Sequence, residues 1–236
     1  MIVIQHMAGN IEGIEEWLER GHNQMNSGNY DEAIKCFDQA IAIDPDYASA
    51  WTGKGSALAN LGNYDEAIKC FDQAIAKNPY DPVTWNNKGN TLDDMGNYDE
   101  AIKCFDQALI IDPKNAIAWN NKGASLSNAG KHDEAIKCFD QAIIIHHNYA
   151  IAWNNKGASL SNSGKHEEAI KCFDIALAID PNYASALYNR ASSNVKQGDL
   201  KNAIEMAKEG YIELAKQDKN FDSIRNDERF KLLIGV

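Results

Sequence analysis

The chain has 236 residues, of which 44% are hydrophobic and 24% are charged, a composition typical of a folded soluble protein rather than a disordered one. Its 34 acidic and 23 basic residues give a net charge of -11, which disfavours binding to phosphate backbones and to anionic membranes. No apolar stretch approaches the roughly 20 residues that a membrane-spanning helix needs. We therefore expect a soluble, cytoplasmic protein that binds neither nucleic acid nor membranes.

Residues 1–13 form an N-terminal segment that is too short to be a domain. The sequence then repeats every 34 residues: Gly-Asn-Tyr-Asp-Glu-Ala-Ile-Lys-Cys-Phe-Asp-Gln-Ala begins at Gly28, Gly62 and Gly96, and edited copies follow. A fixed period of this length is typical of repeat architectures, in which each repeat buries its apolar face against its neighbours. The six repeats occupy residues 14–47, 48–81, 82–115, 116–149, 150–183 and 184–217.

Each repeat begins with a predicted helix, and the second repeat illustrates the pattern. Trp51, Gly55 and Leu58 recur at i, i+4 and i+7, which places them on one helical face. Gly62 interrupts the pattern and predicts a turn. The glycine at position 55 also favours a close approach of the helix that follows.

A second helix is predicted after that turn. Asn63, followed three residues later by Glu66, is typical of a capping box at a helix start. Pro79 follows the expected end of this helix. Its apolar stripe consists of Ala67, Phe71, Ala74 and Ile75.

The recurring residues resemble the signature of the tetratricopeptide repeat (TPR) family. In the second repeat that signature falls on Trp51, Gly55, Leu58, Gly62, Tyr64, Ala67, Phe71, Ala74 and Pro79. The resemblance implies an all-α fold, a right-handed α-solenoid of six helix-turn-helix repeats. The sequence of these repeats is similar to that of repeats in archaeal and bacterial TPR proteins. Residues 218–236 are expected to form a C-terminal capping helix with an apolar face of Phe221, Ile224, Phe230 and Leu233.

The cysteines and histidines predict neither catalysis nor metal binding. One cysteine recurs per repeat, at Cys36, Cys70, Cys104, Cys138 and Cys172. Each lies among the small residues of the second helix, so we interpret it as a buried packing residue. No Cys-x-x-Cys pair, phosphate-binding loop or nucleophile elbow occurs. We expect no enzymatic activity and no cofactor.

Asparagines are the candidate binding residues, because a carboxamide both donates and accepts hydrogen bonds and so suits a peptide bond. In TPR proteins the first helices line a concave groove, and this resemblance implies that asparagines on those helices face a peptide. The sixth position of the repeats holds Asn87, Asn121, Asn155 and Asn189. The candidate set further includes Asn86, Asn120 and Asn154 at the fifth position, and Asn90. Asparagine at the sixth position is also common in TPR repeats, so inherited consensus is the competing interpretation.

A row of basic residues lies next to this face and has two interpretations. It consists of Arg20, Lys54, Lys88, Lys122, Lys156 and Arg190. The row could bind an acidic ligand, but we favour pairing with a nearby Asp or Glu, with the aliphatic stem buried.

The leading functional hypothesis is a scaffold that binds a protein or peptide partner, as an extended peptide or a helix, in the groove. The alternative is a structural or assembly element that stacks end to end or acts as a spacer. The sequence leaves the oligomeric state open.

Overall fold

The computed structural model describes the backbone of residues 2–198 and the side chains of residues 13–198. Over that range the chain folds into eleven α-helices and no strand. The helices are α1 (Ile2–Asn26), α2 (Tyr30–Ile43), α3 (Ala48–Asn60), α4 (Tyr64–Lys77), α5 (Pro82–Asp94), α6 (Tyr98–Ile111), α7 (Ala116–Asn128), α8 (His132–Ile145), α9 (Ala150–Asn162), α10 (His166–Ile179) and α11 (Ala184–Gln197). The expected capping helix over 218–236, like the second helix of the sixth repeat, lies outside the described residues.

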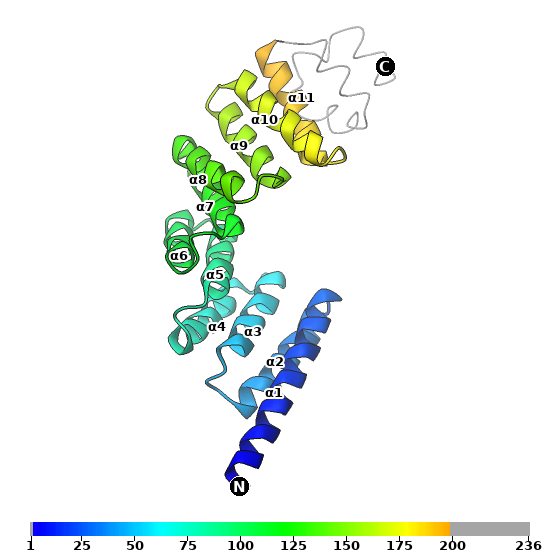
Figure 1. The fold of residues 1–236 in the computed structure, drawn as a ribbon, viewed down its shortest axis with the longest axis vertical. Helices are drawn as coiled ribbons and strands as arrows, with labels where there is room; N and C mark the ends of the chain where they lie inside the picture. The colour runs from blue at the N-terminus through cyan, green and yellow to red at the C-terminus, as the bar shows by residue number, and fades with distance from the viewer. Residues whose placement is uncertain (1, 199–236) are drawn as a thin grey trace. The chain divides into compact units, whose positions relative to one another are not determined.

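The chain divides into two compact halves, Met1–Lys114 and Asn115–Val236, called here the N-terminal and C-terminal halves. In the N-terminal half, α1 packs on α2, α3 on α4 and α5 on α6, and each hairpin packs on the next (Figure 1). In the C-terminal half, α7 pairs with α8 and α9 with α10, and α11 packs on α10. First helices of consecutive repeats within a half also touch one another. These helix pairs confirm the predicted TPR α-solenoid.

A phenylalanine ring packed on a glycine forms the centre of each of the first five repeats. Phe71 on α4 is fully buried, and a Cβ added at Gly55 on α3 would lie 2.7 Å from its Cε1 atom. Equivalent contacts join Gly89 to Phe105, Gly123 to Phe139 and Gly157 to Phe173. Because interiors are close-packed, a methyl group here would displace the ring. The periodic glycine is therefore required by packing.

The tryptophan of the first helix ties that helix to the loop before it. The indole N–H donates to a carbonyl six residues earlier, from Trp51 to Pro45 at 2.9 Å, from Trp85 to Pro79 at 2.9 Å and from Trp153 to His147 at 3.2 Å. Such a bond satisfies the one polar group of a half-buried tryptophan. It also fixes how the chain enters these three repeats.

The turn inside each repeat differs in one detail from the prediction. Gly62 has φ +80°, and its N–H donates to the carbonyl of Ala59, while the N–H of Asn63 donates to the carbonyl of Leu58. These two bonds are a Schellman motif, which ends α3. The Asn63 side chain makes no capping bond. The predicted capping box is wrong because Glu66 would have to accept the Asn63 N–H that the Leu58 carbonyl already receives.

Candidate functional site

The sixth-position asparagines lie half-buried on the first helices, and each half is described separately. In the N-terminal half, Nδ2 of Asn87 on α5 donates to Oγ of Ser56 on α3 at 3.2 Å. This bond links the third repeat to the second. The side chain is therefore held in place by the scaffold.

In the C-terminal half, the asparagines form a hydrogen-bonded chain of carboxamides. Asn189 donates to Asn154 at 3.0 Å, Asn154 to Asn155 at 3.2 Å, Asn155 to Asn120 at 3.1 Å and Asn120 to Asn121 at 3.3 Å. A carboxamide has two N–H groups and two acceptor lone pairs. Asn155 donates one N–H to Asn120 and accepts one hydrogen bond from Asn154. One N–H and one acceptor lone pair of its carboxamide therefore remain for another molecule.

The fifth-position asparagines have a different environment from the sixth. Asn120 and Asn154 are only 5% exposed, and they hold the neighbouring sixth-position side chains through the bonds just described. Asn86 is half-buried, and Asn90 is half-buried at the edge of a pocket. The sequence predicted all eight asparagines as one set, whereas the geometry divides them into supporting and outward-facing residues.

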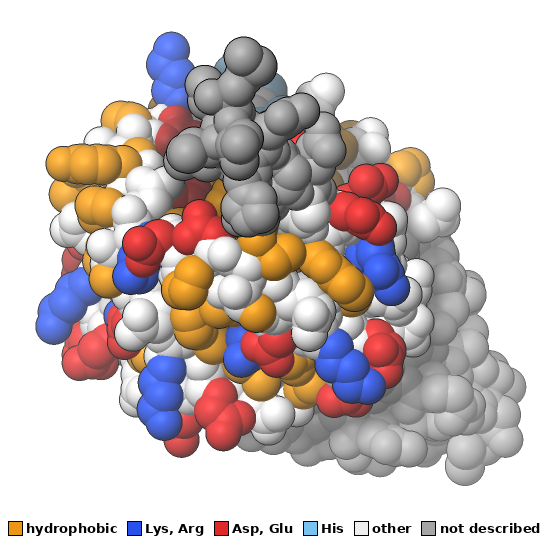
Figure 2. Space-filling model, turned by 90° about the horizontal axis from the view of Figure 1, so that it is seen from below, with side chains coloured by type: hydrophobic (Ala, Val, Ile, Leu, Met, Phe, Trp, Pro, Cys, Tyr) orange, Lys and Arg blue, Asp and Glu red, His pale blue; other side chains and the backbone are white. Residues whose placement is uncertain are grey.

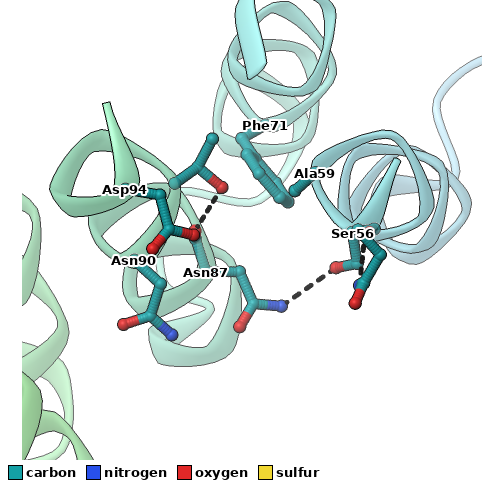
Figure 3. Close-up of a pocket in the computed structure, with 8 residues that line it drawn as sticks. Ser56, Ala59, Phe71, Asn87, Asn90 and Asp94 are labelled. Carbon is teal, nitrogen blue, oxygen red and sulfur yellow. Dashed lines mark hydrogen bonds between the residues drawn. The ribbon is translucent and has the colours of Figure 1, made fainter. Parts of the chain in front are cut away.

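The pocket in the N-terminal half lies where α3 and α5 meet above the core ring, and its volume is about 260 Å³. The residues drawn in Figure 3 include Ser56 and Ala59 from α3, Phe71 from α4, and Asn87, Asn90 and Asp94 from α5. On α5 the three labelled side chains are spaced by three and four residues, which places them on one helical face. The pocket thus combines an apolar floor with polar walls and one carboxylate.

The C-terminal half contains the same pocket three repeats later, with a volume of about 190 Å³. All of its lining residues except Tyr188 lie 102 positions further along the chain than residues that line the N-terminal pocket. Phe173, Asn162 and Asn189 reproduce Phe71, Asn60 and Asn87. The main change is Lys196, which stands in the place of Asp94.

Asp94 and Lys196 were missed by the sequence-based prediction. Their column, the thirteenth of the repeat, otherwise holds asparagine, as at Asn60, Asn128 and Asn162. The sequence signal for these two residues is a change of residue type in one column of the repeat, not a residue that recurs. A column-by-column comparison for charge changes would have found both residues.

Four members of the basic row pair with carboxylates of the preceding repeat. The ion pairs are Lys54 with Asp38 at 2.7 Å, Lys88 with Asp72 at 2.5 Å, Lys156 with Asp140 at 2.7 Å and Arg190 with Asp174 at 2.6 Å. Each of these lysines also lies over the tryptophan of its own helix, at 5.5–5.9 Å from the ring centroid. These contacts agree with the favoured interpretation, in which each basic residue pairs with a nearby Asp or Glu, and they also link successive repeats.

All five cysteines are buried, and none of them forms a disulfide. Burial raises the pKa of the thiols of Cys70, Cys104 and Cys172, so they are protonated and weakly nucleophilic near neutral pH. Among the described residues, no group of three or more potential metal ligands gathers at one place.

The face of the protein in Figure 2 carries acidic and basic side chains interspersed among apolar ones. Among the described residues of this face, Lys and Arg side chains stand apart from one another, with acidic side chains between them. None of the described helices combines the length and apolar composition that crossing a bilayer requires.

The helix pairs, the glycine–phenylalanine contact and the 34-residue period define a tetratricopeptide repeat protein. More specifically, residues 2–223 match the family model described as the cilia and flagella-associated protein 70 C-terminal domain, and the chain belongs to that family. No curated protein matches the chain. The repeat class implies a protein–protein interaction scaffold, and such proteins are generally not enzymes.

Several solved structures share the fold at low sequence identity. PilF of Pseudomonas aeruginosa superposes with a TM-score of 0.80 at 17% identity, covering 92% of this chain and 98% of that one. PilW, a type IV pilus biogenesis factor, gives 0.80 at 19% identity, covering 89% and 97%. YrrB, described as a TPR protein with an unusual peptide-binding site, gives 0.61 at 22% identity, covering 76% and 96%. At these sequence identities, the superpositions show a shared fold.

Proposed function

We propose that the protein binds an extended peptide of a partner protein along its first helices, through the sixth-position asparagines. The observation that carries the proposal is the carboxamide chain of the C-terminal half. In that chain Asn155 is held by neighbours on both sides and retains one donor and one acceptor. A fixed donor and acceptor of this kind match the C=O and N–H of a peptide backbone.

The spacing of the asparagines suits an extended ligand. Helices pack at about 8–10 Å, so first helices of successive repeats place Asn121, Asn155 and Asn189 roughly 10 Å apart. An extended chain advances about 3.3 Å per residue, so each asparagine meets about every third residue of the peptide. Three asparagines then span roughly 20 Å, or about six residues.

Exposed apolar side chains on the first helices favour a weakly charged ligand. Val83 on α5 is 55% exposed, Ile117 on α7 is 56% exposed and Ile151 on α9 is 45% exposed. Burying such groups against a partner is favourable at about 25 cal/mol per Å² of apolar area. We therefore expect a peptide with small apolar side chains rather than a polybasic one.

The test is calorimetric titration of a peptide selected by display against the wild type and the double variant Asn121→Ala, Asn155→Ala. Each lost hydrogen bond removes about 0.5–1.5 kcal/mol, so the affinity should fall by roughly one to two powers of ten. Gln141→Ala on the second helix α8 is the control and should bind normally. Unchanged affinity in the double variant, with wild-type circular dichroism, contradicts the proposal.

A second candidate function is self-association, because second helices carry exposed isoleucines. In the C-terminal half, Ile144 on α8 is 61% exposed and Ile175 on α10 is 39% exposed. Apolar groups of this kind, if contiguous, are typical of association surfaces. Light scattering across a dilution series separates the two functions, since an assembly element changes mass with concentration and a peptide-binding scaffold does not.

A further inference from the structure

Asp94 is the acidic member of a column that otherwise holds asparagine or lysine in the second to sixth repeats. Asn60, Asn128 and Asn162 occupy the same position in other repeats. Asp94 is the last residue of α5, and its side chain reaches the pocket between α3 and α5 (Figure 3). The change from asparagine adds a negative charge to the pocket while keeping the size of the side chain.

This carboxylate is poorly placed for the stability of the fold. The C-terminal end of a helix carries a partial negative charge, which disfavours an acidic side chain there. Burial and the neighbouring Asp93 raise the pKa of the Asp94 carboxyl. Within residues 13–198, no hydrogen bond or ion pair compensates it, in contrast with Asp38 and Asp72 of the basic row. An acidic residue at the C-terminal end of a helix, without a hydrogen bond or ion pair that offsets its cost, points to a role in binding.

The shape and lining of the pocket suit a long basic side chain. Ala59, half-buried beside the buried ring of Phe71, supplies an apolar surface that can cover part of a methylene stem. Asp94 supplies the counter-charge at the rim, and Asn87 and Asn90 add carboxamide oxygens on the same face of α5. A volume of about 260 Å³ leaves room for one such side chain. Acidic and carboxamide oxygens are the acceptors that an ammonium or guanidinium group needs.

We infer that the pocket of the N-terminal half binds one lysine or arginine side chain of the peptide ligand, with Asp94 as its counter-ion. This inference rests on the proposed peptide-binding function and specifies one residue of an otherwise weakly charged ligand. The corresponding pocket of the C-terminal half, with Lys196 in that place, rejects a basic side chain. The two pockets therefore have opposite preferences for the charge of a ligand side chain.

A small probe tests the pocket without any assumption about the peptide. The full chain, labelled with ¹⁵N, is titrated with Nα-acetyl-lysine methylamide and with its uncharged analogue, Nα-acetyl-norleucine methylamide. The lysine compound should shift the amide signals of Asn87, Asn90 and Thr91, and Asp94→Asn should weaken its binding about two- to fivefold, as expected for a solvent-screened ion pair. Binding of the norleucine compound should not change.

Two further variants control the experiment. Asp31→Asn on α2 removes the same charge from an exposed site outside the pocket, and it should bind the lysine probe as the wild type does. Lys196→Asp gives the pocket of the C-terminal half the rim charge of the N-terminal one, and it should gain signal shifts at Asn189 and Ser193 with the lysine probe. Equal response of wild type and Asp94→Asn, or equal weakening by Asp31→Asn, overturns the inference.

Selection from a phage-displayed library of random nine-residue peptides separates this inference from the proposed function. Peptides enriched in lysine or arginine at one position by the wild type, and without that enrichment by Asp94→Asn, support both. Peptides recovered without a basic preference overturn the pocket and leave peptide binding intact. Recovery of no peptide, together with specific shifts from the lysine probe, supports the pocket and contradicts the proposed function.

Discussion

The pockets of the two halves are built from the same columns of the repeat and differ in charge. In both, a fully buried phenylalanine, Phe71 or Phe173, forms the floor, and a half-buried asparagine, Asn87 or Asn189, forms one wall. Asp94 at the rim of one pocket is replaced by Lys196 in the other. The shared residues pack the helices together, whereas the charged residue at the rim, Asp94 or Lys196, is exposed to solvent.

This comparison indicates how the repeats of one protein can differ in ligand specificity. Duplication copies the scaffold and the binding position together, so the recurring residues describe the fold. A charge introduced into one copy changes what that copy binds while leaving the packing intact.

The largest effect is expected at the floor of each pocket. Phe71→Ala and Phe173→Ala each remove a ring that is fully buried against a glycine. Each should lower the free energy of unfolding by about 3–5 kcal/mol, because a cavity is left in a close-packed core. Urea denaturation measures both values. A loss below about 1 kcal/mol in either variant would show that the two floors are not equivalent.

A smaller effect is expected on the other side of the same contact. Gly55→Ala and Gly157→Ala place a methyl group 2.7 Å and 2.6 Å from the Cε1 atom of the ring. Alanine normally stabilises a helix relative to glycine by about 1 kcal/mol. Here overpacking should reverse the sign and lower the free energy of unfolding by about 1–3 kcal/mol. Thermal unfolding of the two variants tests this, and a raised melting temperature contradicts it.

The smallest effect is expected at the charged column, and its sign should differ between the halves. Asp94→Asn removes a negative charge from the C-terminal end of α5 and should raise the free energy of unfolding by about 0.3–1 kcal/mol. Lys196→Asn removes a favourable charge from the last turn of α11 and should lower it by a similar amount. Changes of the same sign in both variants, measured by urea denaturation at low salt, would contradict the comparison.

The Asp94 effect should also depend on pH. Burial and Asp93 raise the pKa of Asp94 in the folded state, so the folded protein binds this proton more tightly than the unfolded chain does. Its contribution to stability is therefore full below the unfolded pKa, about 3.9, and is lost as the pH rises through the folded value. The advantage of Asp94→Asn should be larger at pH 7 than at pH 3.5. Denaturation curves at both pH values check this order.

The fold was predictable because its determinants recur. The spacing of Trp51, Gly55 and Phe71 repeats often enough to define the helix pairs, and their contacts are as the pattern indicates. The wrong detail was the capping box, since residue types at Asn63 and Glu66 do not reveal that a backbone N–H is already used. Backbone geometry decides which acceptor, the Leu58 carbonyl or the Glu66 side chain, receives this N–H.

The candidate site was predictable in part. The asparagine columns are visible in the sequence, but their division into buried supports and half-buried outward residues depends on which carboxamide bonds which neighbour. Asn154 and Asn155 are adjacent and chemically identical, yet only Asn154 is nearly inaccessible. The pocket itself required the approach of α3 to α5, which no single repeat specifies.

The most direct test of the central claim, peptide binding along the sixth-position asparagines, is a ¹⁵N spectrum of asparagine side chains recorded with a display-selected peptide. Peptide binding should shift the side-chain amide signals of Asn155 and Asn189 most, with smaller shifts for the buried Asn120 and Asn154. Gln141 on α8 should not respond. Shifts confined to the second helices, with those of Asn155 and Asn189 unchanged, would contradict the account.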